Sequence, residues 1–289
     1  MKLSSARVQH PKFLTPKPAT LHAPGGGHNI ATMEDLKTRL DALVQQYNVP
    51  QFVGNDPVQF PRMFTAFRDI EIAAFLASTI AWGNRKQILK GCHKMLFDIM
   101  HGNPFEFVMN GECESINPDI NIHRTFFGRD LQYMCRGLKW VYTMHESLES
   151  VFSCEIDPWN GISYFNALMA DGNDGKSNKH LSDPGRKTKS HKGASACKRM
   201  HLMLRWLVRK DGNVDLGVWQ RIPEYRLMIP LDVHVGRVAR ELGLLERKQD
   251  DRMAVELLTD KLREYDINDP IRYDFALFGY GEQQKYQRA

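Results

Sequence analysis

Two residues of the sequence, Lys198 and Asp232, have the types and setting that chemistry on a sugar would need. The neutral amine of a lysine can attack an electrophilic carbon and form a Schiff base. A nearby carboxylate can stabilise the positive charge that develops when a glycosidic bond breaks. The structural alternatives are that Lys198 belongs to a basic helix face with Arg205 and Arg209, and that Asp232 only caps a helix.

Positive charge is concentrated just before Lys198. The chain of 289 residues has a net charge of +5, but the segment 176–199 alone has eight Lys or Arg residues and a single acid, Asp183. The other residues together carry a small negative charge. Such a concentration favours a surface that contacts phosphate groups. The alternative is a solvated, flexible loop. His180, Asp183 and His191 lie in this segment, and solvated side chains are expected there in preference to a metal site.

Apolar residues recur at helical spacing along most of the chain, and no alternating strand pattern of useful length occurs. Residues 69–81 are apolar on nearly every side, which predicts a deeply buried helix. Ser195 is the expected N-cap of a helix with Lys198 in its first turn, and Asp232 is the expected N-cap of the next helix. The sequence therefore predicts an all-α fold. Other helices are expected near residues 33–44, 88–99, 131–152, 253–263 and 273–278, with Trp206 and Trp219 in the core.

Two segments lack the apolar periodicity of a helix or a strand. Residues 1–32 contain several prolines, a run of three glycines, four basic residues and no acid, and are expected to form a disordered basic arm. Residues 170–194 are rich in Gly, Asn, Ser and Lys, which predicts a long, partly disordered basic loop. No apolar run is long enough for a membrane span, and the five cysteines lack the spacing of a metal site. We therefore expect a cytoplasmic protein without metal or cofactor.

One sequence motif resembles that of a known family. The sequence Ile229-Pro-Leu-Asp232-Val-His234-Val-Gly-Arg237-Val-Ala239 is similar to a signature of helix-hairpin-helix DNA glycosylases. In that superfamily the aspartate is catalytic, and bifunctional members have their lysine at the start of the preceding long helix. Lys198 occupies that place in this chain. The resemblance therefore implies a catalytic pair made of Lys198 and Asp232.

The segment Ala74–Lys94 resembles a second block of the superfamily, in which a turn after a buried helix inserts residues into the duplex. Trp82, Asn84 and Arg85 would fill that turn. The chain departs from the superfamily before the lysine, where Gly193-Ala-Ser195 replaces the usual Gly-hydrophobic-Gly hairpin that binds a phosphate. The basic run would then hold the phosphate instead.

Other phrases are similar to a bacterial family catalogued only as a domain of unknown function, whose nearest characterised analogue is the archaeal 8-oxoguanine glycosylases. These phrases are Ser195–Arg199, Leu204–Arg209, Ile229–Asp232 and Asp274–Gly279. The iron–sulfur cluster of some superfamily members has no matching cysteine run in this chain.

The resemblance implies two helical subdomains with a cleft between them: a terminal one from residues 33–70 and 225–289, and a central one from residues 71–224. It also implies a monomeric, nucleoid-associated DNA repair glycosylase with AP-lyase activity. Its substrate would be double-stranded DNA that contains an oxidised purine such as 8-oxoguanine. The residues expected to contact DNA are Trp82, Asn84, Arg85, Lys187, Lys189, Lys192, Ser195, Arg199, His234 and Arg237, and those expected to hold the base are Phe275 and Phe278.

Two alternatives stay open at this point. A non-catalytic DNA- or RNA-binding module with the same fold would bind nucleic acid in a salt-dependent way without releasing a base. An enzyme that acts on RNA would prefer single-stranded RNA to a damaged duplex.

Overall fold

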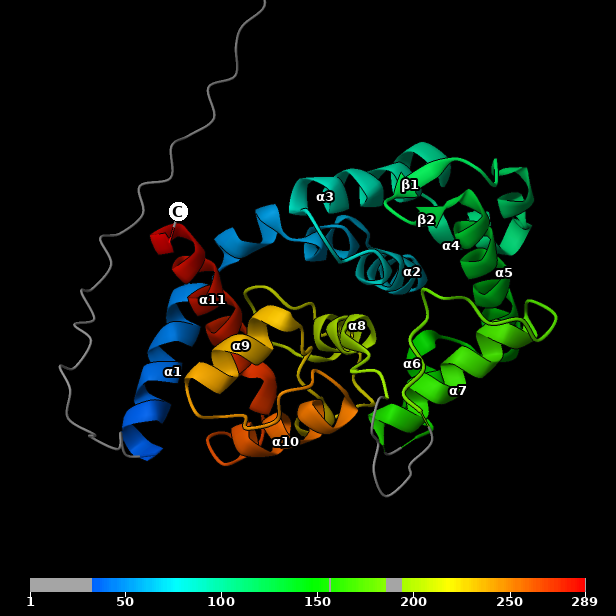
Figure 1. Cartoon of the computed structure of the whole chain (residues 1–289). Helices are drawn as coiled ribbons and strands as arrows, with labels where there is room; N and C mark the ends of the chain where they lie inside the picture. The colour runs from blue at the N-terminus through cyan, green and yellow to red at the C-terminus, as the bar shows by residue number, and fades with distance from the viewer. Residues whose placement is uncertain (1–32, 156, 186–193, 289) are drawn as a thin grey trace, which may run out of the picture.

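The structure is a computed structural model, and it describes residues 33–155, 157–185 and 194–288 (Figure 1). The described chain is mainly helical, which confirms the predicted all-α class. Within these ranges, no helix is both long enough and apolar enough to cross a membrane. The predicted basic arm lies outside the described residues, and so do three residues expected to contact DNA, Lys187, Lys189 and Lys192.

The described chain contains eleven α-helices. In chain order they are α1 (Met33–Tyr47), α2 (Phe67–Thr79), α3 (Arg85–His93), α4 (Pro104–Asn110), α5 (Gly128–Met144), α6 (Leu148–Ser153), α7 (Pro158–Asp171), α8 (Lys198–Val208), α9 (Val233–Glu241), α10 (Arg252–Arg263) and α11 (Asp274–Arg288). A π-helical stretch, Lys94–Ile99, continues α3. A short antiparallel hairpin, β1 (Asn121–His123) and β2 (Phe126–Phe127), lies between α4 and α5.

Helix α2 lies in the centre of the core. Its residues from Ile72 to Ala77 are fully buried, because the apolar side chains of this segment point to every side of the helix. It packs against α8, which buries Met203, Trp206 and Leu207. The predicted buried helix and the predicted core position of Trp206 are therefore confirmed.

The first and last described helices lie side by side. Both α1 and α9 pack against α11, while α10 packs against the short turn that leads into α11 (Figure 1). Helix α7 packs against α5 and α6 in another part of the molecule. The assignment of residues 33–70 and 225–289 to one subdomain, and of 71–224 to the other, stays a prediction.

The prediction of one helix over residues 131–152 is wrong in one respect, because the chain forms two helices there, α5 and α6. Ser147 ends the connection between α5 and α6, and its Oγ accepts a hydrogen bond from Ser150 N at 3.0 Å. The buried carboxylate of Glu71 on α2 also accepts hydrogen bonds from Leu148 N and Glu149 N, at 3.0 and 2.9 Å. A side chain 77 residues away from Leu148 thus fixes the break.

Other differences lie at the predicted loop. Helix α7 was not predicted, but it ends at Asp171, close to the predicted start of the loop at residue 170. The described part of the loop packs onto the body, where the side chain of Asn173 donates a hydrogen bond to Tyr133 O at 3.0 Å. His180 is only 6% exposed, so the prediction that it is hydrated is wrong. The last helix also extends beyond its predicted end, to Arg288.

Candidate active site

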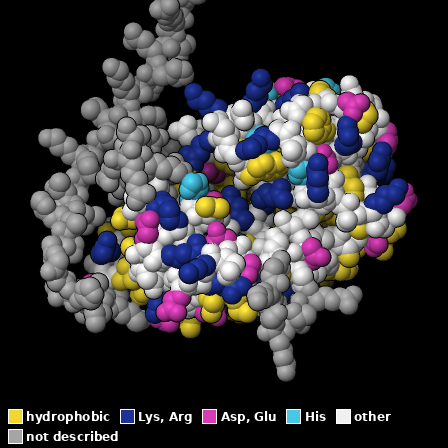
Figure 2. Space-filling model, viewed as in Figure 1, with side chains coloured by type: hydrophobic (Ala, Val, Ile, Leu, Met, Phe, Trp, Pro, Cys, Tyr) yellow, Lys and Arg dark blue, Asp and Glu magenta, His cyan; other side chains and the backbone are white. Residues whose placement is uncertain are grey.

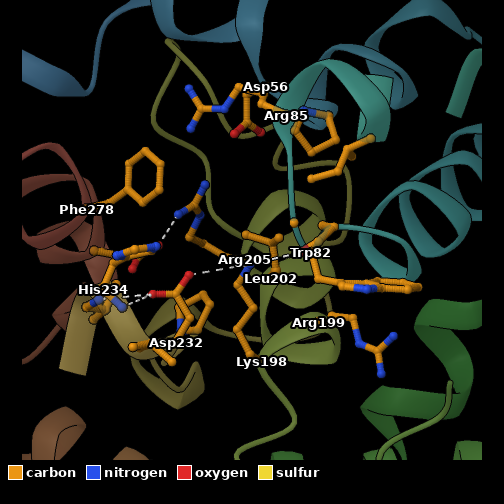
Figure 3. Close-up of a pocket in the computed structure, with 18 of the residues that line it drawn as sticks. Asp56, Trp82, Arg85, Lys198, Arg199, Leu202, Arg205, Asp232, His234 and Phe278 are labelled. Carbon is orange, nitrogen blue, oxygen red and sulfur yellow. Dashed lines mark hydrogen bonds and ion pairs between the residues drawn. The ribbon is translucent and has the colours of Figure 1, made fainter. Parts of the chain in front are cut away.

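A cavity of about 870 Å³ opens beside the turn that follows α2 (Figure 3). Residues of α8, the start of α9 and the start of α11 also line it, together with residues from the turns before α2 and from two loops, so segments far apart in the sequence meet there. Figure 2 shows a hollowed face of the molecule with Lys and Arg side chains around it. A cavity of this size is typical of sites for small ligands.

Asp232 lies in the wall of the cavity as the N-cap of α9. Its Oδ1 accepts hydrogen bonds from His234 N at 2.9 Å and Val235 N at 3.0 Å, as the sequence predicted. These two bonds fix the carboxylate, because they satisfy amides that the helix itself cannot pair. The other oxygen, Oδ2, is left to face Lys198.

Lys198 is the first residue of α8, so its predicted place in the first turn is confirmed. Its Nζ lies 3.8 Å from Asp232 Oδ2 and donates a hydrogen bond to Ala81 O at 3.3 Å. The side chains of Lys198 and Asp232 are each 27% exposed, so both can meet a ligand in the cavity. The structure therefore brings together the two residues that the sequence singled out for chemistry.

The predicted N-cap of α8, Ser195, is not the cap. The helix begins two residues later than expected, and Cys197 stands at the N-cap position in a left-handed conformation with φ of 44°. Ser195 Oγ accepts a hydrogen bond from Cys197 N at 3.1 Å, and the Ser195 backbone pairs with Asp251. Ser195 thus shapes the turn before the helix, and it does not line the cavity.

Trp82 lies in the cavity wall between other side chains. Its indole stacks on His180, with ring centroids 5.4 Å apart, and the guanidinium of Arg199 lies 5.1 Å from the indole centroid. His123 meets it edge-on at 4.8 Å. The residues around the indole hold it in the wall, and its expected insertion into a duplex stays a prediction.

Arg85 and the two phenylalanines predicted for a base pocket all line the cavity. The Arg85 guanidinium lies 5.2 Å from the ring of Phe278, which is half-buried. Phe275 is almost fully buried, with Arg205 only 4.3 Å from its ring centroid. Phe278 is therefore the more accessible of the two rings. Asn84 also lines the cavity and caps α3 by accepting a hydrogen bond from Gln87 N at 3.3 Å.

The other predicted DNA contacts are divided between the cavity and the surface. Arg199 and His234 line the cavity, and Arg199 Nη1 donates to Thr79 O at 2.8 Å. Burial lowers the pKa of Arg199. Arg237 does not line the cavity, and its guanidinium pairs with Glu241 at 2.7 Å.

A buried ion cluster forms part of the cavity wall, and the sequence did not indicate it. Arg205 Nε donates to Asp215 Oδ1 at 3.2 Å, and Arg205 Nη1 pairs with Asp274. Burial lowers the pKa of Arg205, but the charges of the two carboxylates outweigh this effect and raise it overall. The alternative that placed Arg205 and Arg209 on an exposed basic face is wrong, because each is less than 5% exposed.

Several other residues of the cavity were missed by the sequence analysis. His180 Nε2 lies 3.1 Å from Thr125 O, and burial lowers the pKa of its imidazole. Asp56 reaches the cavity from a short turn that precedes α2. No local pattern marks these residues, because they meet only in the folded chain. The missed residues with polar side chains are Asp56, Thr125, His180, Arg205 and Asp274, whereas Lys179 belongs to the basic segment 176–199 that the sequence indicated.

Helix α3 adds positive charge next to the cavity. Lys86 and Lys90 are exposed and lie four residues apart, on one face of the helix. No acidic residue occurs between positions 72 and 97, so no neighbour in the chain neutralises them. The signal in the sequence is a pair of lysines four residues apart in a stretch without acidic residues.

Metal-ligating side chains do not gather in the described part of the chain: no group of three His, Cys, Asp or Glu residues there could hold an ion. The family described as "Protein of unknown function (DUF2400)" matches residues 56–283. The chain belongs to this family. The comparison with curated proteins and the comparison with solved structures each found no match.

The region shared with the DUF2400 family contains the candidate site. Of the cavity-lining residues, only Phe52 lies before the matched region, and Asp56 is its first residue. The DUF2400 description assigns no activity. A function for this chain must therefore be argued from the cavity and its side chains.

Proposed function

We propose that this chain is a base-excision DNA repair enzyme with the helix-hairpin-helix glycosylase fold, which excises an oxidised purine and then cuts the strand as an AP lyase. The observation that carries the proposal is the pair Lys198 Nζ and Asp232 Oδ2, 3.8 Å apart in the wall of an 870 Å³ cavity. An amine and a carboxylate at this separation can both reach one sugar ring. A cavity of this volume can hold an extruded nucleotide.

Each residue of the pair acts in one step of the proposed reaction. As the glycosidic bond lengthens, the sugar gains positive charge, and Asp232 Oδ2 stabilises that charge. The neutral amine of Lys198 forms a bond to the anomeric carbon, while the base leaves with the electron pair of the broken C–N bond and takes up a proton. Ring opening gives a Schiff base, which allows the 3′ phosphate to leave by elimination.

The contacts of the pair suit these steps. Because Asp232 Oδ1 accepts two amides of α9, the carboxylate cannot swing away from Lys198. The hydrogen bond from Lys198 Nζ to Ala81 O places the amine beside the turn that follows α2. Preorganised charges of this kind need little rearrangement in the transition state.

Positive charge around the cavity supports nucleic acid as the ligand. Arg85, Lys179 and Arg199 line the cavity, and Lys86 and Lys90 are exposed on the adjoining helix α3. Lys and Arg side chains that neutralise phosphates release counterions, which makes binding fall steeply with salt. We therefore expect binding of damaged duplex DNA with a strong salt dependence.

The test is borohydride trapping on a duplex that contains one 8-oxoguanine. Wild type should form a covalent protein–DNA adduct, and Lys198→Gln should form none. Lys139→Gln is the matched control, because Lys139 is an exposed lysine of α5 that does not line the cavity. Its adduct yield should stay close to that of wild type.

The outcomes separate the possible activities. Wild type could release the base without forming a trapped adduct, and Asp232→Asn could abolish that release. This pair of results would indicate a glycosylase without lyase activity. Salt-dependent binding with no base release from a panel of single-lesion duplexes would refute the enzymatic proposal and leave a nucleic-acid-binding module. Trapping that Lys198→Gln does not reduce would refute the role of this lysine.

A further inference from the structure

Another acidic side chain, Asp56, reaches the cavity on a side of it away from Asp232. It lies between two short 3₁₀ turns, Pro50–Asn55 and Pro57–Gln59, which precede α2. In Figure 3, Asp56 and Asp232 lie on either side of Arg205. A nucleotide with its sugar at Lys198 and Asp232 can therefore direct its base toward Asp56.

The local structure fixes Asp56 but leaves acceptor capacity unused. Its Oδ1 accepts a hydrogen bond from Val58 N at 3.1 Å, which caps the second turn. Among the described residues, no other hydrogen bond and no ion pair within 4 Å involves this carboxyl group. Burial raises the pKa of Asp56, while the Val58 amide and the charges of Arg205 and Arg85 oppose that effect. Asp56 is half-buried and lines the cavity, so the acceptor sites that Val58 does not use can meet donors of a ligand there.

Aromatic rings stand beside Asp56. Phe52 belongs to the turn just before it and lines the same cavity. The ring of Phe52 meets that of Phe278 edge-on, with centroids 5.9 Å apart, and both residues are half-buried. Aromatic faces next to hydrogen-bond acceptors suit a flat heterocycle that carries N–H groups along one edge.

We infer that Asp56 reads the edge of the extruded base and selects bases with two adjacent N–H donors, as guanine-type bases have at N1 and N2. This inference rests on the proposed function and adds the class of base. An ionised carboxylate can only accept hydrogen bonds, so it matches the N1–H and the exocyclic amine of a guanine-type edge. An adenine-type edge offers an acceptor at N1, which a carboxylate repels. A thymine-type edge has one N–H between two carbonyl acceptors.

The test uses duplexes that differ only in this edge. One contains 8-oxoguanine and the other 8-oxoadenine, which have the same oxidised C8 and differ at N1 and the exocyclic groups. A third contains 8-oxohypoxanthine, which keeps N1–H and lacks the amine. Single-turnover base release by wild type should favour 8-oxoguanine over 8-oxoadenine by at least tenfold, with 8-oxohypoxanthine between them.

Asp56→Asn should change this order. Asparagine keeps one acceptor and adds a donor that matches adenine N1, so the preference for 8-oxoguanine should fall at least tenfold. The ratio between two substrates is informative because a folding defect would lower both rates together. Asparagine also caps helical turns well, so the turn after Asp56 should persist. Asp171→Asn, an equal charge change at an exposed position of α7, is the control and should leave the ratio unchanged.

The failures are distinguishable. If wild type releases no base from any of the three duplexes and gives no trapped adduct, the proposed function falls and this inference falls with it. If wild type releases base but prefers 8-oxoadenine, or if Asp56→Asn keeps the wild-type ratio, the role of Asp56 alone is refuted.

Discussion

Replacing Asp232 by asparagine and by alanine separates the two roles that the structure gives to this carboxylate. Its Oδ1 caps α9 through the amides of His234 and Val235, while Oδ2 faces Lys198 at 3.8 Å. Asparagine keeps a carbonyl oxygen for the cap but carries no charge. Alanine removes both the cap and the charge.

The expected magnitudes follow from these contacts. Loss of an N-cap aspartate costs about 1 kcal/mol of stability, so Asp232→Ala should lower the Tm by about 2–4 °C, whereas Asp232→Asn should lower it much less. The ion pair with Lys198 is partly exposed, so its loss should change stability by less than about 1 kcal/mol. Removal of a preorganised charge from the transition state should slow base release by roughly 10²–10³-fold in both variants.

Thermal unfolding followed by circular dichroism measures the first effect, and single-turnover base release measures the second. We expect a large loss in the rate of base release in both variants, and a clear loss of stability only in Asp232→Ala. An equal fall of Tm in both variants would show that the cap is not what the carboxylate contributes to stability. Base release by Asp232→Asn within about twofold of the wild-type rate would refute its role in the reaction.

Three further predictions concern stability and binding. The pKa of Glu71 is raised to about 7 by burial, so the folded state binds its proton more tightly than the unfolded chain does. The bound proton therefore adds about 3 kcal/mol to the free energy of unfolding below pH 4.5, and this stabilisation is lost as the pH rises through 7. Urea unfolding of Glu71→Gln should lack this part of the pH dependence. His201 is buried with both ring nitrogens unpaired among the described residues, so His201→Phe should raise stability by about 1 kcal/mol in the same assay, and a loss would contradict the reasoning. Lys90→Gln should reduce the slope of log binding constant against log salt by about 1, while Lys261→Gln on α10 should leave it unchanged; equal slopes in the two variants would exclude α3 from the binding surface.

Short-range patterns in the sequence predicted the parts of the fold that depend on neighbouring residues. The apolar run 69–81 predicted the buried helix α2, because a helix without a polar face must be covered on all sides. Asp232 was expected to cap α9, because its side chain needs only the next few amides. The position of Lys198 in the first turn of α8 followed in the same way.

Long-range contacts explain what the sequence could not predict. Ser195 is a favourable capping residue by type, but its backbone pairs with Asp251, and the helix starts only after a left-handed residue. Glu71 satisfies the first amide of α6 through a hydrogen bond that spans 77 residues. Asp56 and Arg205 become cavity residues only because the turn before α2 and the helix α8 lie beside the same space.

Helix α8 links the candidate chemistry to the core. Lys198, Leu202 and Arg205 follow one another at helical spacing and all line the cavity, so they lie on one face of α8. Helix α8 also packs against α2. Arg205 is held by two buried carboxylates, Asp215 and Asp274, and the second of these begins α11. Removing either carboxylate would leave a buried charge without full compensation, so this face of α8 has little freedom to shift. The cluster thereby fixes the direction from which Lys198 enters the cavity, two turns along the same helix.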